Sequence, residues 1–394
     1  TIYHDALGLR EVYYTTKNID NDIICGSQPS LIKRFSKKTL RKCSNTKKKY
    51  FMEVESKKVR KGRLWIGDET AFEDIMHLLP NHYLDVDTRI PVRYWPKKKL
   101  QRKKIEEIAG FANTYLSGAM QALSFRNDLM MAVTAGIDSR TLLAVSRPFR
   151  HKIYYFINKE SWHSGLEADF IVTSKIFKEI NVPFHKHNVS QNVDDEYFRK
   201  MFFKNSFFAH EFMLPTIYNI YYKTHSNKIN ILGVGEIGRG YYQNEPHKIN
   251  AYGLMRSSRY KSSIYVFEQC QKWLDEVTVM ADNCNINIRT LFLWEQLLGN
   301  WGSVGNSESD IAIEEIDPYN SHLLYENLLS IDSYKDENCG EGVFKKIIEI
   351  SWPELLKYPF NPPIYFSEKI KNKIKKLKIY NILKRIFLVI VLLK

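Results

Sequence analysis

The sequence predicts an α/β protein in which a parallel sheet with flanking helices follows a β-rich N-terminal region. Three observations lead to this prediction. Apolar strand-like runs alternate with helical patterns between residues 129 and 234, and the runs before residue 97 are short and separated by turn residues. In addition, 44% of the 394 residues are hydrophobic. That share is enough to build a large core, which excludes a wholly disordered chain.

Residues 1–96 form the first predicted domain. Short runs typical of strands lie at Tyr3, 12–14, 22–25, 64–66 and 82–86. Gly8 and Gly26 stand near these runs, as expected where the chain turns. A run of six basic residues and no acidic residue follows at 97–104, which is typical of a linker.

Residues 97–367 form the second predicted domain, followed by a tail over 368–394. Helices are expected at 105–123, from Ser139 onward and across 166–180, and strands at 129–133, 153–157, 184–189 and 229–234. Strands that alternate with helices form a parallel sheet, in which ligands bind at the carboxyl ends of the strands. The sequence from 255 onward has mainly helical character.

The net charge of +14 does not indicate a nucleic-acid partner. Three runs, at 33–63, 97–104 and 368–394, together carry +26, so the rest of the chain carries −12. A nucleic-acid-binding protein would instead spread positive charge over its working face. We therefore expect no nucleic-acid partner and interpret the runs as solvated loops, a linker and a tail.

The tail at 368–394 has further interpretations. Its apolar stretch at 386–393 is eight residues long, far short of the roughly 20 residues that span a bilayer. Because a Lys-rich segment precedes it, weak peripheral contact with an anionic membrane surface is one interpretation. Docking on the protein and truncation of a longer anchor are the others.

The cysteines indicate a reducing compartment. They are widely scattered and odd in number: Cys25, Cys43, Cys270, Cys284 and Cys339. No C-x-x-C pair occurs, so we expect reduced thiols and a cytoplasmic protein.

The segment after the strand at 129–133 has the strongest functional pattern. Small residues lead from the strand into a helix in the order Thr134, Ala135, Gly136, Ile137, Asp138 and Ser139. Small residues let backbone N–H groups approach an anion, and a helix N-terminus adds partial positive charge. Ser139 can cap the helix or donate to a phosphate oxygen, while Asp138 is expected to hold Mg²⁺. The structural alternative is an ordinary strand–turn–helix corner that Asp138 and Ser139 cap.

This segment resembles the S-G-G-x-D-S pyrophosphate loop of the ATP pyrophosphatase (PP-loop) superfamily. Thr134 and Ala135 stand in place of the Ser and the first Gly. No Walker A motif occurs anywhere in the chain.

Three later segments resemble the asparagine synthase (glutamine-hydrolysing) family. Residues 231–241 are similar to its G-E-G-A-D-E-L-F-G-G-Y segment, with Glu236 on the final Glu and Gly235 in place of the Asp. Residues 313–319 are similar to L-E-V-R-V-P-F-L-D, with Ile316 in place of the Arg. Residues 342–354 are similar to the segment that holds the family's late lysine.

The resemblance implies a PP-loop fold and an AMP-forming, ATP-dependent amide ligase. Its cofactors would be ATP and Mg²⁺, and its substrates a small-molecule carboxylate and an amine donor. By the same resemblance, residues 134–137 and Ser139 bind the pyrophosphate of ATP and Asp138 binds the metal. Glu236 is the candidate base, and Lys345 or Lys346 stabilises charge on the reacting phosphate.

The N-terminal region resembles part of the same family's class II (Ntn-type) glutaminase domain. The resemblance covers residues 3–14, 24–28 and 67–95. That domain uses an N-terminal cysteine as its nucleophile, whereas this sequence begins at Thr1. We therefore expect a partial glutaminase domain, shortened by truncation or by loss, and a ligase that takes ammonia or another amine.

Three alternatives remain open. A non-catalytic nucleotide-binding protein that retains the fold is favoured by the substitutions at 134–135, Gly235 and Ile316. A sulfur- or nitrogen-transferring enzyme acting on tRNA would use the same loop, but the charge of −12 outside the basic runs disfavours it. Gly233, Gly235 and Gly238 match G-x-G-x-x-G, yet the residues that follow do not open an amphipathic helix, which disfavours a dinucleotide site.

Overall fold

The protein is described by a computed structural model that covers most of the chain. The described residues are 1–16, 23–35, 47–50, 66–159, 166–206, 209–240, 246–260, 262–331 and 339–363. The predicted strand positions 22, 64 and 65 and the tail at 368–394 lie outside these residues. Among the described helices, none is both long and apolar enough to cross a bilayer.

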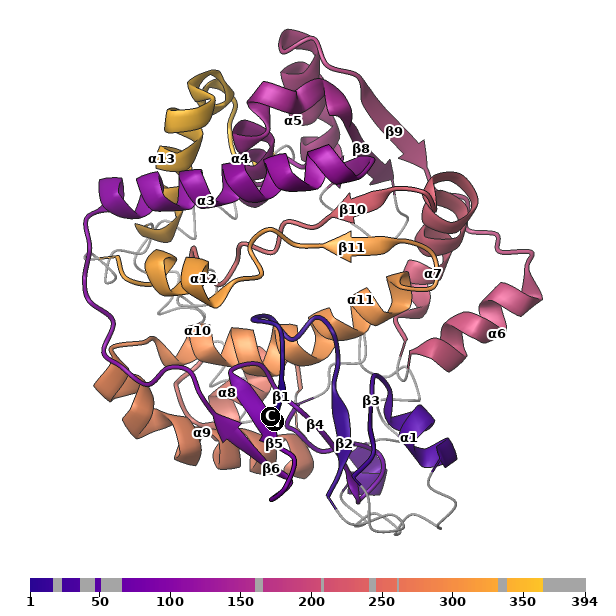
Figure 1. Cartoon of the computed structure of the whole chain (residues 1–394), viewed down its shortest axis with the longest axis vertical. Helices are drawn as coiled ribbons and strands as arrows, with labels where there is room; N and C mark the ends of the chain where they lie inside the picture. Colours follow the sequence, from indigo (N-terminus) through magenta and orange to yellow (C-terminus); the bar gives the residue numbers. More distant parts are fainter. Residues whose placement is uncertain are drawn as a thin grey trace, which may run out of the picture.

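A five-stranded parallel sheet forms the centre of the fold (Figure 1). In sheet order its strands are β11 (Glu314–Ile316), β10 (Ile229–Ile231), β7 (Leu129–Ala132), β8 (Ile153–Lys159) and β9 (Phe184–Asn188). The chain enters at β7, winds outward to β9, and then returns to place β10 on the other side of β7. The winding therefore reverses between β7 and β10, and ligands of open α/β sheets bind at such a reversal.

Helices cover both faces of this sheet. One face packs against α3 (Ile105–Arg126), α4 (Ile137–Val145), α5 (Leu166–Glu179) and α13 (Cys339–Ser351), and the other against α6 (Glu196–Asn205) and the π-helix η3 (Ile217–His225). Successive side chains of a strand point to opposite faces. Leu129 and Met131 accordingly join the first core cluster and Met130 the second. Burial on both faces explains why this strand is a continuous apolar run.

The predicted parallel sheet is confirmed, and it has one strand that the sequence pattern did not indicate. Each of the four predicted strands between 129 and 234 matches an observed one to within three residues. The missed strand, β11, is only three residues long and begins with two glutamates. It forms because it pairs with β10 in register, with Ile229 opposite Glu314.

Two small antiparallel sheets form the N-terminal region. One orders β1 (Ile2–Tyr3), β5 (His82–Asp85) and β6 (Ile90–Arg93), and the other orders β3 (Cys25–Gly26), β2 (Tyr13–Thr15) and β4 (Ile75–His77) beside α1 (Pro29–Phe35). Figure 1 shows both sheets in the lower part of the view, below the parallel sheet. Ile66, which was expected to end a strand, lies in no strand, and residues 67–68 after it form a bend.

The remaining described residues are mainly helical. They comprise the α-helices α7 (Leu214–Thr216), α8 (Ala251–Ser257), α9 (Ile264–Cys284), α10 (Ile288–Phe292), α11 (Ser303–Ser309) and α12 (His322–Leu328), the π-helix η4 (Leu293–Gly302), and the short 3₁₀ helices η1 (Arg147–Lys152), η2 (Glu211–Met213) and η5 (Pro353–Lys357). Leu7 and Trp95 share one core cluster with Trp273 and Trp294 of α9 and η4. The N-terminal region is thus packed onto the helical part.

Cys25, Cys270 and Cys284 are free thiols.

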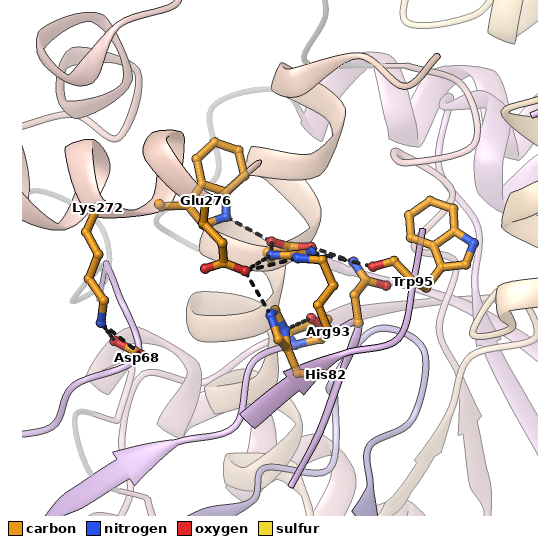
Figure 2. A network of polar contacts seen from close by, with 10 residues as sticks. Asp68, His82, Arg93, Trp95, Lys272 and Glu276 are labelled. Carbon is orange, nitrogen blue, oxygen red and sulfur yellow. Dashed lines mark hydrogen bonds and ion pairs between the residues drawn. The ribbon is translucent and has the colours of Figure 1, made fainter. Parts of the chain in front are cut away.

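A buried ion pair joins the N-terminal region to these helices (Figure 2). Glu295 is fully buried and accepts hydrogen bonds from Arg93, from Asn81 Nδ2 at 2.8 Å and from Trp273 Nε1 at 2.8 Å. Burial alone would raise the pKa of Glu295, but the adjacent Arg93 guanidinium holds it below its usual value. Arg93 also donates to the half-exposed Glu276 at 2.8 Å.

Arg93→Ala tests the contribution of this pair to stability. The substitution leaves the Glu295 carboxylate buried without its counter-ion, so we expect a loss of about 3–5 kcal/mol in the free energy of unfolding, measured by urea denaturation. Lys272→Ala is the matched control, because Lys272 pairs with Asp68 at 3.0 Å on the exposed side of the same contact. It should cost less than about 1 kcal/mol. Equal losses for the two variants would contradict this assignment.

Glu315 of β11 predicts a pH dependence of stability. It is buried, accepts from Asn230 Nδ2 at 2.7 Å, and burial raises its pKa from 4.5 to about 7. Between these values the native state keeps a proton that the unfolded state has lost, so stability falls as the pH rises from about 4.5 to 7.

Glu315→Gln should remove this contribution. Relative to the unsubstituted chain, the variant should gain at most about 3 kcal/mol in unfolding free energy between pH 5 and pH 8. Glu314→Gln, on the exposed neighbour that pairs with Arg10, should leave the pH profile unchanged. A Glu315→Gln profile that runs parallel to that of the unsubstituted chain would show that the assignment is wrong.

Candidate functional site

The loops that follow β7, β10 and β11 meet at the carboxyl edge of the parallel sheet. The Leu232 N–H donates to Ile316 O at 2.9 Å, which continues the β10–β11 pairing to this edge. A Cβ added to Gly235 would lie 2.9 Å from Asp138 Oδ1. Two segments far apart in the sequence, each singled out by its pattern, are therefore adjacent in the fold.

The loop at 134–139 is held by its own side chains. Ser139 Oγ accepts from the Thr134 N–H at 3.0 Å and lies 3.0 Å from Thr134 Oγ1. Thr134 Oγ1 in turn accepts from the Gly136 N–H at 3.1 Å. The N-cap residue of α4 is Gly136, which has no side chain to accept a hydrogen bond. Asp138 and Ser139 therefore do not cap this helix, which corrects that part of the structural alternative.

The first turn of α4 consequently presents backbone N–H groups at the sheet edge. Ile137, Asp138 and Ser139 are the first helical residues, and the N–H groups of a first turn have no acceptor within their own helix. The helix dipole makes this end partially positive. The arrangement can accept an anion.

Three carboxyl groups stand beside this helix end. Burial, followed by the charge of Asp138, raises the pKa of Glu236 to about 7. Burial also raises the pKa of Asp317 to about 7, although Asp317 accepts N–H bonds from Tyr319 at 3.0 Å and Val234 at 3.2 Å. The Oε2 atom of Glu236 is buried and has no hydrogen-bond partner among the described residues. The negative charge of each of these groups disfavours ionisation of its neighbours.

Arg239 supplies one positive charge to this cluster. Its Nε lies 2.9 and 3.0 Å from the two carboxylate oxygens of Asp138, and both side chains are mostly buried. Burial raises the pKa of Asp138, and the Arg239 charge opposes that rise. The α13 helix begins against the same residue, because a Cβ added to Gly340 would lie 2.2 Å from Arg239 O.

The structure separates the two candidate lysines. Lys345 pairs with Glu341 at 3.5 Å and lies 5.8 Å from the centre of the Phe360 ring, which covers Arg140 of α4. Lys346 pairs with Glu349 at 2.9 Å, and this partner raises the pKa of Lys346. Lys345 is therefore on the side of α13 that faces the loop region, although both side chains are part-exposed.

Two glycines of the G-x-G-x-x-G match serve close packing. A Cβ added to Gly235 would lie 2.9 Å from Asp138 and one added to Gly238 would lie 2.5 Å from Leu328, whereas Gly233 has room for a Cβ. Residues 236–240 form a turn and not the helix that a dinucleotide fingerprint requires.

Sequence reasoning missed Asp317, Arg239 and Tyr319 as members of this site. Tyr319 is buried and donates to the backbone carbonyl of Asp138 at 3.1 Å. Asp317 directly follows β11, so a strand prediction at 314–316 would have brought it to the same edge. For Arg239 no local pattern gave a signal, because its partner lies in another loop.

Comparison of the sequence with protein-family models and with curated proteins gives no match.

Proposed function

We propose that this chain is an asparagine-synthase-like, AMP-forming amide ligase with a PP-loop type of ATP site. The observation that carries the proposal is the meeting of Asp138 and Glu236 beside the uncapped start of α4, where the winding of the sheet reverses. The motif resemblance along the chain supports it. By the same resemblance, we propose that residues 1–96 are a partial Ntn-type glutaminase domain.

The residues at this edge fit Mg²⁺. Carboxylate oxygens are its preferred protein ligands, and the partnerless Glu236 Oε2 is a buried acceptor that a nearby cation would stabilise. Within the described ranges, no group of three or more ligating side chains could hold a metal alone. Mg²⁺ usually binds through one or two carboxylates together with substrate phosphates, so that finding agrees with the proposed site. When bound at Asp138, the ion would neutralise charge on the phosphates.

The residues of this chain have separate roles in the proposed reaction. The N–H groups of 137–139 bind the pyrophosphate portion of ATP, within a loop whose shape Thr134, Ala135 and Gly136 maintain. A substrate carboxylate oxygen bonds to the α-phosphorus, and the bond from that phosphorus to pyrophosphate breaks. Lys345 adds positive charge near the leaving group.

Glu236 acts in the second step. An amine bonds to the acyl carbon, the bond to AMP breaks, and Glu236 accepts a proton from the amine. A pKa of about 7 suits this transfer, because the carboxylate is then partly deprotonated near neutral pH.

Two observations favour the alternative of a non-catalytic nucleotide-binding protein. Arg239 already neutralises Asp138, and Gly235 lacks the acidic group that the resemblance leads one to expect. In that case nucleotide would bind without being cleaved.

Pyrophosphate release from ATP distinguishes the two functions. We expect release with a suitable carboxylate and amine, tested over a panel that includes aspartate with ammonium. Asp138→Asn should reduce the rate by at least about 100-fold, because charge stabilisation at the phosphates is lost, while the circular dichroism spectrum stays unchanged. Asp310→Asn, on an exposed partner of Arg10, is the control. ATP binding without release would support the alternative, and absence of ATP binding would contradict both.

The Arg239 ion pair gives a second prediction. Since Mg²⁺ and the guanidinium compete for the same carboxylate, Arg239→Gln should lower by several-fold the Mg²⁺ concentration that half-saturates ATP binding, measured by calorimetry. If Mg²⁺ left ATP binding unchanged in both proteins, Asp138 would not be the metal ligand.

A further inference from the structure

Arg140 is a fully buried arginine directly below the candidate phosphate loop. It belongs to α4, and its side chain is 0% exposed. Arginine side chains are almost never fully buried unless they are paired. A residue that violates this rule beside a loop suited to anions therefore needs an explanation.

The guanidinium bonds to carbonyl groups. It donates to Ala135 O at 2.6 Å and Gly136 O at 3.2 Å, and on its other side to Tyr358 O at 2.9 Å and Pro359 O at 2.8 Å. Within the described ranges, no carboxylate lies within ion-pair distance of it. The charge of Asp169 acts on Arg140 without an ion pair between the two side chains. Because arginine stays protonated in proteins, the residue is a buried cation.

Residues 358–361, here called the strap, connect this cation to the loop. The Asn361 N–H donates to Ala135 O at 3.1 Å, and the Phe360 ring centre lies 3.6 Å from the Arg140 guanidinium. Because a peptide group is planar, a carbonyl held on one side directs the N–H of the same peptide to the other side. Arg140 and the strap thus hold the carbonyls of Ala135 and Gly136 below the loop and leave the start of α4 facing the carboxyl cluster.

A second observation points to a ligand at this helix end. Glu236 beside it has a buried carboxylate oxygen with no hydrogen-bond partner among the described residues. A cation that accompanies a polyphosphate would satisfy that oxygen, while the polyphosphate would supply the anion that Arg140 lacks.

We propose that Arg140 is a positioning residue whose buried charge makes the loop select polyphosphates over monophosphates. The inference rests on the proposed function, since it assumes that phosphates bind at residues 137–139. A buried charge acts through a low dielectric, which strengthens its attraction to an anion. This attraction also grows with the charge of the ligand. Pyrophosphate and ATP should depend on Arg140 much more than AMP does.

Calorimetric titration with inorganic pyrophosphate and with AMP tests this inference. Arg140→Gln keeps amide donors but removes the charge, and should weaken pyrophosphate binding about tenfold and AMP binding less than about threefold. Arg140→Lys keeps the charge and should restore most of the pyrophosphate affinity. If Arg140 were purely structural, Arg140→Gln would weaken the binding of both ligands alike, and Arg140→Lys would not restore it. That result would overturn the inference.

Two further variants complete the test. Arg147→Gln is the matched control, because Arg147 contacts Trp352 and Glu354 of the same C-terminal segment without reaching the loop. It should leave both affinities unchanged. Asp169→Asn keeps the acceptor for the Ala135 N–H but removes the negative charge that partly offsets Arg140. It should tighten pyrophosphate binding several-fold. This measurement tests the inference even if Arg140→Gln does not fold.

The outcomes separate the two proposals. If pyrophosphate fails to bind the unsubstituted chain, the proposed function is contradicted. If it binds the unsubstituted chain and Arg140→Gln equally, or if Asp169→Asn weakens it, the inference about Arg140 alone is overturned.

Discussion

The parallel pairing of β10 with β7 is the constraint on which the rest of this structure depends. Ile229 lies opposite Leu129 and Ile231 opposite Met131, so both strands end at the same edge. Their loops must then meet, although they come from distant parts of the chain. The same pairing makes the winding reverse at β7, which opens the edge of the sheet to a ligand.

Buried charge is the second feature that organises the molecule. Buried charges lie at Glu295, at Arg140 and in the cluster around Asp138. Each of them is compensated in a different way. Arg93 compensates Glu295 directly. Arg140 is compensated mainly by carbonyl dipoles, and Asp138 by Arg239 beside two further acidic groups. The pair of Arg93 and Glu295 joins two parts of the chain. Arg140 and the cluster around Asp138 keep charge that a bound ligand could neutralise.

Local sequence patterns were enough for four of the five strands of the parallel sheet and for the loops that follow β7 and β10. The strand at 129–132 is buried on both faces, and such strands are continuous apolar runs that are easy to recognise. The loop at 134–139 was singled out because small residues lead there from a strand into a helix, a pattern that suits an anion site but also an ordinary corner. β11 was missed because Glu314 and Glu315 do not resemble a strand until β10 provides their partner. Arg239 and Arg140 were missed because their roles come from contacts with distant segments.

The most direct test of the account is the position of the phosphates in a crystal structure of the chain bound to ATP and Mg²⁺. We expect phosphate oxygens about 3 Å from the backbone nitrogens of 137–139, a metal on Asp138, and Arg239 displaced from that carboxylate. A nucleotide bound elsewhere on the protein, with Arg239 still paired to Asp138, would contradict it.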